Sequence, residues 1–137
     1  MDIESPSRQI AALPWRKRRG RVEILLITSR ETKRWVIPKG WPMPGRTDHT
    51  AARQEAFEEA GIEGRISKTS IGTFAYEKRL ENGDGTYCRV DVFPLKVQNL
   101  KRNWPEKAER TRAWFSVEEA AYLVRDADLE MVILGLG

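Results

Sequence analysis

The first part of the chain consists of short apolar runs separated by polar turns. Residues 9–15 are mostly apolar and residues 22–28 (VEILLIT) are β-branched and apolar, which favours two strands. The polar residues 17–20 between them predict a turn, so we expect a hairpin. A third apolar run, residues 35–37, ends at a proline, and the prolines and glycines of residues 39–46 predict a loop.

The clearest helix signal covers residues 48–60. Alanine, glutamine and glutamate dominate its interior, Thr47 or Asp48 can cap its N-terminus, and Gly61 stands where a helix end favours positive φ. Further strands are expected at 66–78, 86–97 and 111–115, a turn at 82–85, and helices at 117–124 (capped by Ser116) and 128–134. Strands interspersed with helices in this way predict a layer-packed α/β or α+β fold.

Length and composition indicate a single domain that buries a core without disulfides. The 137 residues fit one domain, 1–137, and the lone cysteine, Cys88, excludes an intramolecular disulfide and suits a reducing compartment. The sequence has neither a run of about 20 apolar residues nor the pattern of a secretory signal at its N-terminus. We therefore expect a cytoplasmic protein with no membrane contact, whose oligomeric state, a homodimer included, stays open.

The charge distribution does not by itself favour a nucleic acid partner. The net charge is only +4, from 24 basic and 20 acidic residues. Five of the basic residues lie close together at Arg16, Lys17, Arg18, Arg19 and Arg21. A solvated hairpin turn explains this run, and a phosphate-rich partner such as an RNA end is the alternative. No stacking-aromatic motif of a known RNA-binding module is visible, which argues against that alternative.

Three carboxylates share one face of the predicted helix. At about 100° per residue, Glu58 and Glu59 lie at roughly −60° and +40° from Glu55. Ala51 and Ala52 are expected on this side, where their small size leaves room for a neighbouring loop. The other side is expected to face a core with Ala56, Phe57 and Ala60. Like charges at this spacing destabilise a helix, so the geometry leaves open a solvated acidic face or a site for a hard divalent cation.

The spacing of residues 40–62, GWPMPGRTDHTAARQEAFEEAGI, resembles the Nudix box. That pattern runs Gly, five residues, Glu, seven residues, Arg-Glu-apolar-x-Glu-Glu-x-Gly-apolar. The residues that fall on it are Gly40, Glu55, Ala56, Glu58, Glu59, Gly61 and Ile62. The lead-in WVIPKG at 35–40, and RAWF at 112–115 followed by EEA at 118–120, also look like this family. The likeness therefore covers most of the chain.

The resemblance implies an α/β/α sandwich with a mixed sheet, and a hydrolase that attacks a phosphoanhydride with water. It implies that Glu55, Glu58 and Glu59 are catalytic and bind Mg²⁺ or Mn²⁺, with the Gly40 carbonyl as a further ligand. Such an ion neutralises phosphate oxygens and lowers the pKa of bound water. One glutamate of the trio, or one from the later loop with Glu106 and Glu109, would act as base; solvated loop charges are the alternative for the last two.

Two positions depart from the family pattern. Arg46 stands where the box has a glutamate, and Gln54 stands where it has an arginine. In the family these two residues help to brace the loop against the helix. A re-wired structural contact is one interpretation. A weakened or redirected active site is the other, and it raises the alternative of a non-catalytic Nudix-like module that binds a phosphate ligand.

The subgroup most similar in appearance acts on diphosphoinositol polyphosphates and diadenosine polyphosphates. The Pro-Lys-Gly lead-in and the Arg-x-Trp-Phe-x-x-Glu-Glu-Ala stretch carry this likeness. Substrates with many phosphates need cations around the metal site. The predicted substrate-binding residues are Lys39, Arg30, Arg8, Lys33 and Arg46. The expected partner is therefore a small-molecule phosphoanhydride.

Overall fold

The hairpin expected near the N-terminus forms the centre of the sheet. The computed structural model describes residues 7–79, 83 and 85–137. Strands β1 (Ser7–Arg18) and β2 (Arg21–Thr28) pair antiparallel. The turn between them is shorter than the predicted 17–20, since it consists of Arg19 and Gly20, both at positive φ. A two-residue turn of this kind matches the right-handed twist of the strands that it joins.

The remaining elements follow the expected order with more strands than predicted. They are β3 (Trp35–Val36), β4 (Lys39–Gly40), α1 (Asp48–Ala60), β5 (Ile62–Ile66), β6 (Gly72–Arg79), β7 (Gly85–Leu100), a 3₁₀ turn (Lys107–Glu109), β8 (Arg112–Ser116), α2 (Val117–Leu123) and α3 (Ala127–Leu134). The predicted turn at 82–85 falls largely outside the described residues. None of the helices in the described ranges is long and apolar enough to cross a membrane.

Eight strands of the described residues form one mixed sheet. Its main path runs β3-β2-β1-β7-β5, with β4 beside β1, β6 beside β7 and β8 beside β2. The β1–β7 pair is parallel over nine residue pairs, from Ser7 opposite Cys88 to Trp15 opposite Lys96, and the other pairs are antiparallel. The mixed sheet expected from the family resemblance is therefore present.

Two segments of the sheet differ from the sequence prediction. Lys39 and Gly40, expected in a loop, pair with β1 as strand β4. The single strand expected at 66–78 is divided into β5 and β6, which pair with different stretches of β7. In the segment between them, the hydroxyl groups of Ser67 and Ser70 bond to nearby backbone groups. Such local bonds compete with the strand ladder, and the apolar pattern alone does not reveal them.

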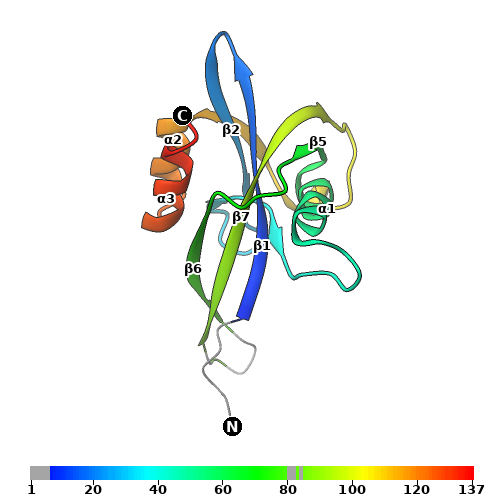
Figure 1. Ribbon diagram of the computed structural model, residues 1–137, viewed down its shortest axis with the longest axis vertical. Coiled ribbons are helices and arrows are strands. Elements are labelled where there is room, and N and C mark those ends of the chain that lie inside the picture. The colour runs from blue at the N-terminus through cyan, green and yellow to red at the C-terminus, as the bar shows by residue number, and fades with distance from the viewer. Residues whose placement is uncertain (1–6, 80–82, 84) are drawn as a thin grey trace.

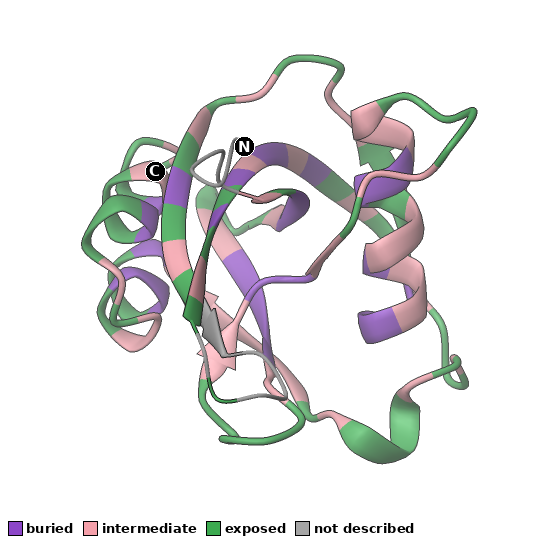
Figure 2. Cartoon of the chain, turned by 90° about the horizontal axis from the view of Figure 1, so that it is seen from below, coloured by how far each residue is buried: buried purple, intermediate pink, exposed green. Residues whose placement is uncertain are grey.

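Helices cover both faces of the sheet, α1 on one side and α2 with α3 on the other (Figure 1). Successive residues of β1 point to opposite faces, so Ile10 and Ala12 pack with α1 while Ala11 and Leu13 pack towards α2 and α3. The buried positions accordingly lie along the strands and on the inner faces of the helices (Figure 2). A sheet buried on both sides explains why the first strands read as near-continuous apolar runs.

The predicted bounds and caps of α1 are confirmed. The Thr47 side chain accepts a hydrogen bond from the Thr50 N–H at the N-terminus. Gly61 ends the helix at a φ of 68°, a left-handed conformation that glycine adopts without steric cost. These caps fix which residues form the last two turns, and therefore which way the three glutamates point.

Candidate functional site

The three glutamates of α1 lie at the border between the helix's buried and exposed faces. Glu59 is buried with 8% of its surface exposed, whereas Glu55 and Glu58 are partly exposed. The alanines that bury the inner face of the helix are Ala51, Ala52, Ala56 and Ala60. The prediction for this face was wrong in two respects, because Ala51 and Ala52 belong to the core and Phe57 is partly exposed. The acidic face therefore adjoins the core, which is why Glu59 is buried.

Strand β4 brings the backbone of Gly40 against Glu55. Gly40 is held opposite Ile10 of β1 by the antiparallel pairing. A Cβ atom added at Gly40 would lie 2.3 Å from the Glu55 carboxyl carbon, far inside any allowed contact. The neighbouring Lys39 N–H donates to Glu59 Oε1 at 3.4 Å. A larger residue at position 40 would therefore displace the Glu55 carboxyl group. The role of the Gly40 carbonyl as a metal ligand stays a prediction.

Glu55 and Glu59 form a carboxyl pair one helical turn apart. The two groups repel each other when both are charged. Burial raises the pKa of Glu59 to about 8, against the attraction of Arg110 and with repulsion from Glu55 adding to it. Burial also raises the pKa of Glu55. The site thus carries more carboxylates than its surroundings neutralise.

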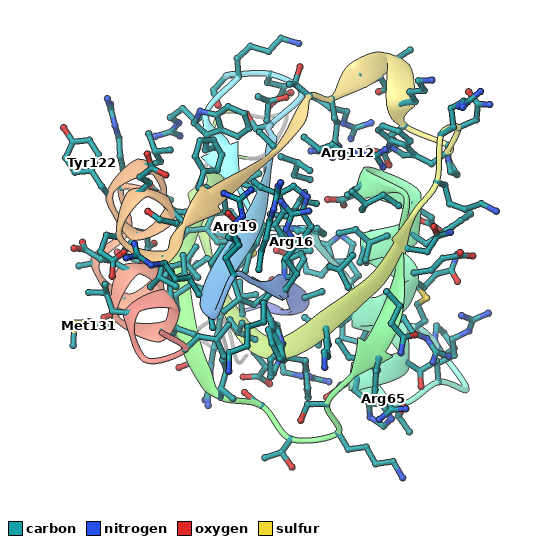
Figure 3. All side chains as sticks on the ribbon, turned by 90° about the horizontal axis from the view of Figure 1, so that it is seen from above. Arg16, Arg19, Arg65, Arg112, Tyr122 and Met131 are labelled. Carbon is teal, nitrogen blue, oxygen red and sulfur yellow. The ribbon has the colours of Figure 1, made fainter. Side chains whose placement is uncertain are left out.

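The segment 101–111 closes over the C-terminal end of α1. The last carbonyl groups of a helix have no partner within it. Here the Glu106 N–H donates to the Glu58 carbonyl (3.1 Å) and Trp104 Nε1 to the Glu59 carbonyl (3.1 Å). Arg112 Nη1 donates to the Ala60 carbonyl at 2.7 Å. Figure 3 shows Arg112 beside this end of the helix. The first two bonds attach the segment to the helix that carries the glutamates, and the third attaches the start of β8 to it.

Arg110 is a residue of the site that the sequence reasoning missed. Its side chain is 9% exposed, and Nη2 lies 3.7 Å from Glu59 Oε1. Nε donates to Glu106 Oε1 at 2.8 Å and Nη1 donates to the Thr28 carbonyl at 3.1 Å. The only signal in the sequence was the four-residue spacing of Glu106 and Arg110. Arg110 therefore links Glu106 to Glu59. The role of Glu106 as a base stays a prediction.

The predicted phosphate-binding cations lie in different places. Arg30 pairs with Glu109 at 3.3 Å, and the Lys39 ammonium lies 4.9 Å from the centre of the Tyr76 ring. Lys39 adjoins the carboxylate cluster through its backbone N–H, which donates to Glu59 Oε1, and Glu59 raises the pKa of Arg30 only weakly. Arg8 instead pairs with Asp48 in the first turn of α1 and with Asp91 of β7.

The other two predicted cations, Lys33 and Arg46, lie on loops. Lys33 is exposed at a φ of 60°. Arg46 is exposed and donates from Nη1 to Gln54 Oε1 at 3.4 Å. Gln54 in turn donates to Glu58. The two residues that depart from the box therefore contact each other.

A comparison with known families agrees with the spacing of these glutamates. The model of the NUDIX domain matches residues 6–133. The chain belongs to the Nudix family. Nudix domains generally use divalent metal ions. This family membership confirms the resemblance seen in the box, since the match extends over nearly the whole chain.

Curated relatives of the chain are named as hydrolases. Diphosphoinositol polyphosphate phosphohydrolase 3-alpha of Mus musculus is 32% identical over 121 residues, which cover 87% of this chain and 70% of that protein. Nudix hydrolase 12, mitochondrial, of Arabidopsis thaliana is 32% identical over 108 residues, 77% of this chain and 53% of the relative. The chain thus spans about half the length of the Arabidopsis protein. These names support the expected enzyme class, hydrolysis of acid anhydrides that contain phosphorus.

Solved structures with the same fold cover nearly all of the chain. The Ap4A hydrolase of C. elegans superimposes with a TM-score of 0.66 at 21% identity, over 96% of both chains. The NUDIX domain of Shewanella oneidensis NrtR, complexed with ADP ribose, gives 0.69 at 10% identity, over 98% of this chain and 88% of that one. At such identities the likeness establishes the fold, and it confirms the predicted α/β/α sandwich with a mixed sheet.

The donor atoms at the site fit a hard divalent cation. Among residues 7–79, 83 and 85–137, no three His, Cys, Asp or Glu side chains are arranged so that together they could hold a metal ion. Mg²⁺, however, is usually held by one or two carboxylates and several waters, so a convergent trio is not required. Carboxylate oxygens of Glu55, Glu58 and Glu59 lie on one helix face, next to the Gly40 backbone. A cation entering here would offset the repulsion between the Glu55 and Glu59 carboxylates.

Proposed function

We propose that the chain hydrolyses a phosphoanhydride bond of a (di)nucleoside polyphosphate or a diphosphoinositol polyphosphate, with Mg²⁺ or Mn²⁺ held by Glu55, Glu58 and Glu59. The observation that carries this proposal is the cluster of Glu55, Glu58 and Glu59 on one side of α1, against the Gly40 backbone, inside a Nudix-family domain. The substrate class is supported by the names of the relatives, which include a diphosphoinositol polyphosphate phosphohydrolase and an Ap4A hydrolase.

Each group of the site has a role in this reaction that follows from its position. Glu55 and Glu59, whose pKa values are raised by burial, must both be deprotonated to act as ligands. Lys39 and Arg30, at the border of the cluster, would bind and orient the phosphate chain. Glu106, held by Arg110, is a carboxylate beside the glutamates that can accept the proton of the attacking water. The bound ion supplies neutralisation of the phosphate charge and a more acidic water.

A phosphate-release screen with and without Mg²⁺ tests the proposal. It includes dinucleoside polyphosphates, nucleoside triphosphates, nucleotide sugars and diphosphoinositol phosphates. We expect metal-dependent turnover of a dinucleoside or diphosphoinositol substrate. We also expect losses of at least about 100-fold in Glu58→Gln and Glu59→Gln, because even residues that only support a ligand cost about 10- to 100-fold.

The matched control is Glu118→Gln, an exposed glutamate in the first turn of α2 on the opposite face of the sheet. Its turnover should equal that of the wild type. Unchanged turnover in both Glu58→Gln and Glu59→Gln would rule the proposal out. Binding of these substrates without turnover by the wild type would instead support the alternative, a non-catalytic phosphate-binding module.

A further inference from the structure

A chain of three polar side chains runs from the loop before α1 to one of its glutamates. Arg46 lies just before the cap residue Thr47, and its backbone N–H donates to the Met43 carbonyl. Its Nη1 donates to Gln54 Oε1 at 3.4 Å, and Gln54 Nε2 donates to Glu58 Oε2 at 2.9 Å. Gln54 and Glu58 are four residues apart, so they lie on the same side of the helix, one turn apart.

The charges in this chain of contacts explain why residue 54 is neutral. The amide of Gln54 has one acceptor end and one donor end, and it offers the oxygen to Arg46 and the nitrogen to Glu58. An arginine at this position would face the like charge of Arg46, and a glutamate would face the like charge of Glu58. With arginine at position 46, glutamine is therefore the side chain that satisfies both neighbours.

The contacts leave part of Glu58 available. Only Oε2 of its carboxylate accepts a hydrogen bond from the described residues. The backbone of the same residue is also held, because its carbonyl accepts from the Glu106 N–H. Glu58 is thus fixed at its main chain and at one carboxylate oxygen, and its Oε1 can point to a ligand.

We propose that Arg46 and Gln54 form a positioning relay that orients the Glu58 carboxylate for a divalent ion, in place of the glutamate–arginine brace expected from the box. Because Glu58 acts as a ligand only under the function proposed above, the inference rests on it. The loop now supplies a cation where the box has a carboxylate, and the helix supplies a neutral amide where the box has a cation. The relay ends on Glu58, one of the three glutamates proposed to bind the ion. Arg46 and Gln54, the two departures from the box, therefore act together.

Binding of Mn²⁺ alone, followed by electron paramagnetic resonance, tests the relay without turnover. Gln54→Leu removes the amide and keeps a similar volume, so we expect Mn²⁺ to bind about 10- to 100-fold more weakly, as when other partners of metal ligands are removed. Arg46→Met should weaken Mn²⁺ binding several-fold, because Gln54 keeps its bond to Glu58 but loses its orientation. The control is Arg53→Gln, an exposed neighbour on α1, which should bind like the wild type.

An exchange of the two residues tests their pairing. Gln54→Arg places two arginines together, and Arg46→Glu gives the Gln54 amide a carboxylate at each end. Each single variant should bind Mn²⁺ more weakly than the wild type, whereas the double variant Arg46→Glu with Gln54→Arg should regain much of the affinity. Single losses that simply add in the double variant would overturn the pairing.

Thermal unfolding of the metal-free proteins separates positioning from folding. We expect Arg46→Met, on an exposed loop, to keep the wild-type melting temperature while its Mn²⁺ affinity falls. Wild-type Mn²⁺ affinity in both Gln54→Leu and Arg46→Met would overturn the relay and leave the proposed function standing. A wild-type protein that binds no divalent ion would overturn both.

Discussion

At Glu59 a carboxyl group lies at the edge of the core, where the sequence pattern predicted only a position on an acidic face. Glu59 is buried because it lies beside the alanines of α1 that pack on the sheet. Burial raises the pKa of Glu59 to about 8. The free energy of unfolding should therefore depend on pH through this residue.

The first residue-scale prediction concerns the pH dependence of folding without metal. Below the ordinary value of 4.5 the carboxyl is protonated in both states. Between that value and about 8, the unfolded chain loses the proton while the native protein keeps it, so the free energy of unfolding falls as pH rises. We expect this decline to level off above a pH of about 8 and to be reduced in Glu59→Gln.

Urea unfolding in EDTA, at intervals from weakly acidic to weakly alkaline pH, measures this decline. The informative quantity is the difference between the wild type and Glu59→Gln, because all other titrating groups are shared. If the two proteins gave parallel curves, the raised pKa of Glu59 would be contradicted. Addition of Mg²⁺ at alkaline pH should restore stability to the wild type, since binding to the native state alone stabilises it.

At the scale of elements, the segment 101–111 and helix α1 depend on each other. The helix end lacks partners for its last carbonyls. Trp104 and Glu106 of the segment and Arg112 at the start of β8 supply them. Arg112 also donates to the Lys101 carbonyl and stacks on Trp104, with its guanidinium carbon 3.9 Å from the ring centre. Arg112 thus joins the end of α1, at Ala60, to the start of the segment, at Lys101. This contact helps to place Glu106 and Arg110 at the site.

The element-scale prediction is that Arg112→Lys loosens this segment. Lysine keeps the charge but cannot donate to two carbonyls in a fixed plane or stack in the same way. We expect a loss of about 1–3 kcal/mol in the free energy of unfolding, as for a broken charged hydrogen bond. Amide hydrogen exchange should become faster across residues 101–111, and kcat/KM should fall.

The control for this variant is Ser116→Ala. It removes the hydroxyl that accepts from the Glu119 N–H in the capping box of α2, on the opposite face. Loss of such a cap costs about 0.5–2 kcal/mol, a similar destabilisation. Exchange across residues 101–111 should then match the wild type. Equal acceleration in both variants would show that stability alone, and not the Arg112 contacts, governs the segment.

At the scale of the whole molecule, the sheet separates two hydrophobic cores, and only one of them lies under the helix that carries the glutamates. The core beneath α1 supports the glutamates, and the core beneath α2 and α3 closes the other face. Adjacent residues of β2 point into different cores, since Leu25 lies with α1 and Leu26 with α2 and α3, and both are essentially fully buried. Figure 1 shows the two helical layers on opposite sides.

Leu25→Ala and Leu26→Ala test this division at the whole-molecule scale. Each should lower the free energy of unfolding by about 2–5 kcal/mol, the cost of a large core deletion. Only Leu25→Ala should also weaken Mn²⁺ binding and kcat/KM, because its cavity lies under the helix that carries the site. Both are measured at a temperature where the variants remain folded. Equal effects on Mn²⁺ binding would contradict the separation.

The sequence by itself determined the features that depend on neighbours along the chain. Helix α1, its caps at Thr47 and Gly61, and the shared face of its glutamates follow from spacings within a few turns, and the box gave the family. These features rest on backbone geometry and hydrogen bonds within a few residues, which are written directly in the order of the amino acids.

Tertiary structure alone decided which distant groups meet at that face. The burial of Glu59, the place of Arg110 between Glu59 and Glu106, and the contact of Arg46 with Gln54 depend on how strands and loops pack. Arg110 lies 51 residues after Glu59 along the chain, and no local pattern encodes such a contact. The physical reason is that burial and charge pairing depend on distances in space, which the folded sheet sets.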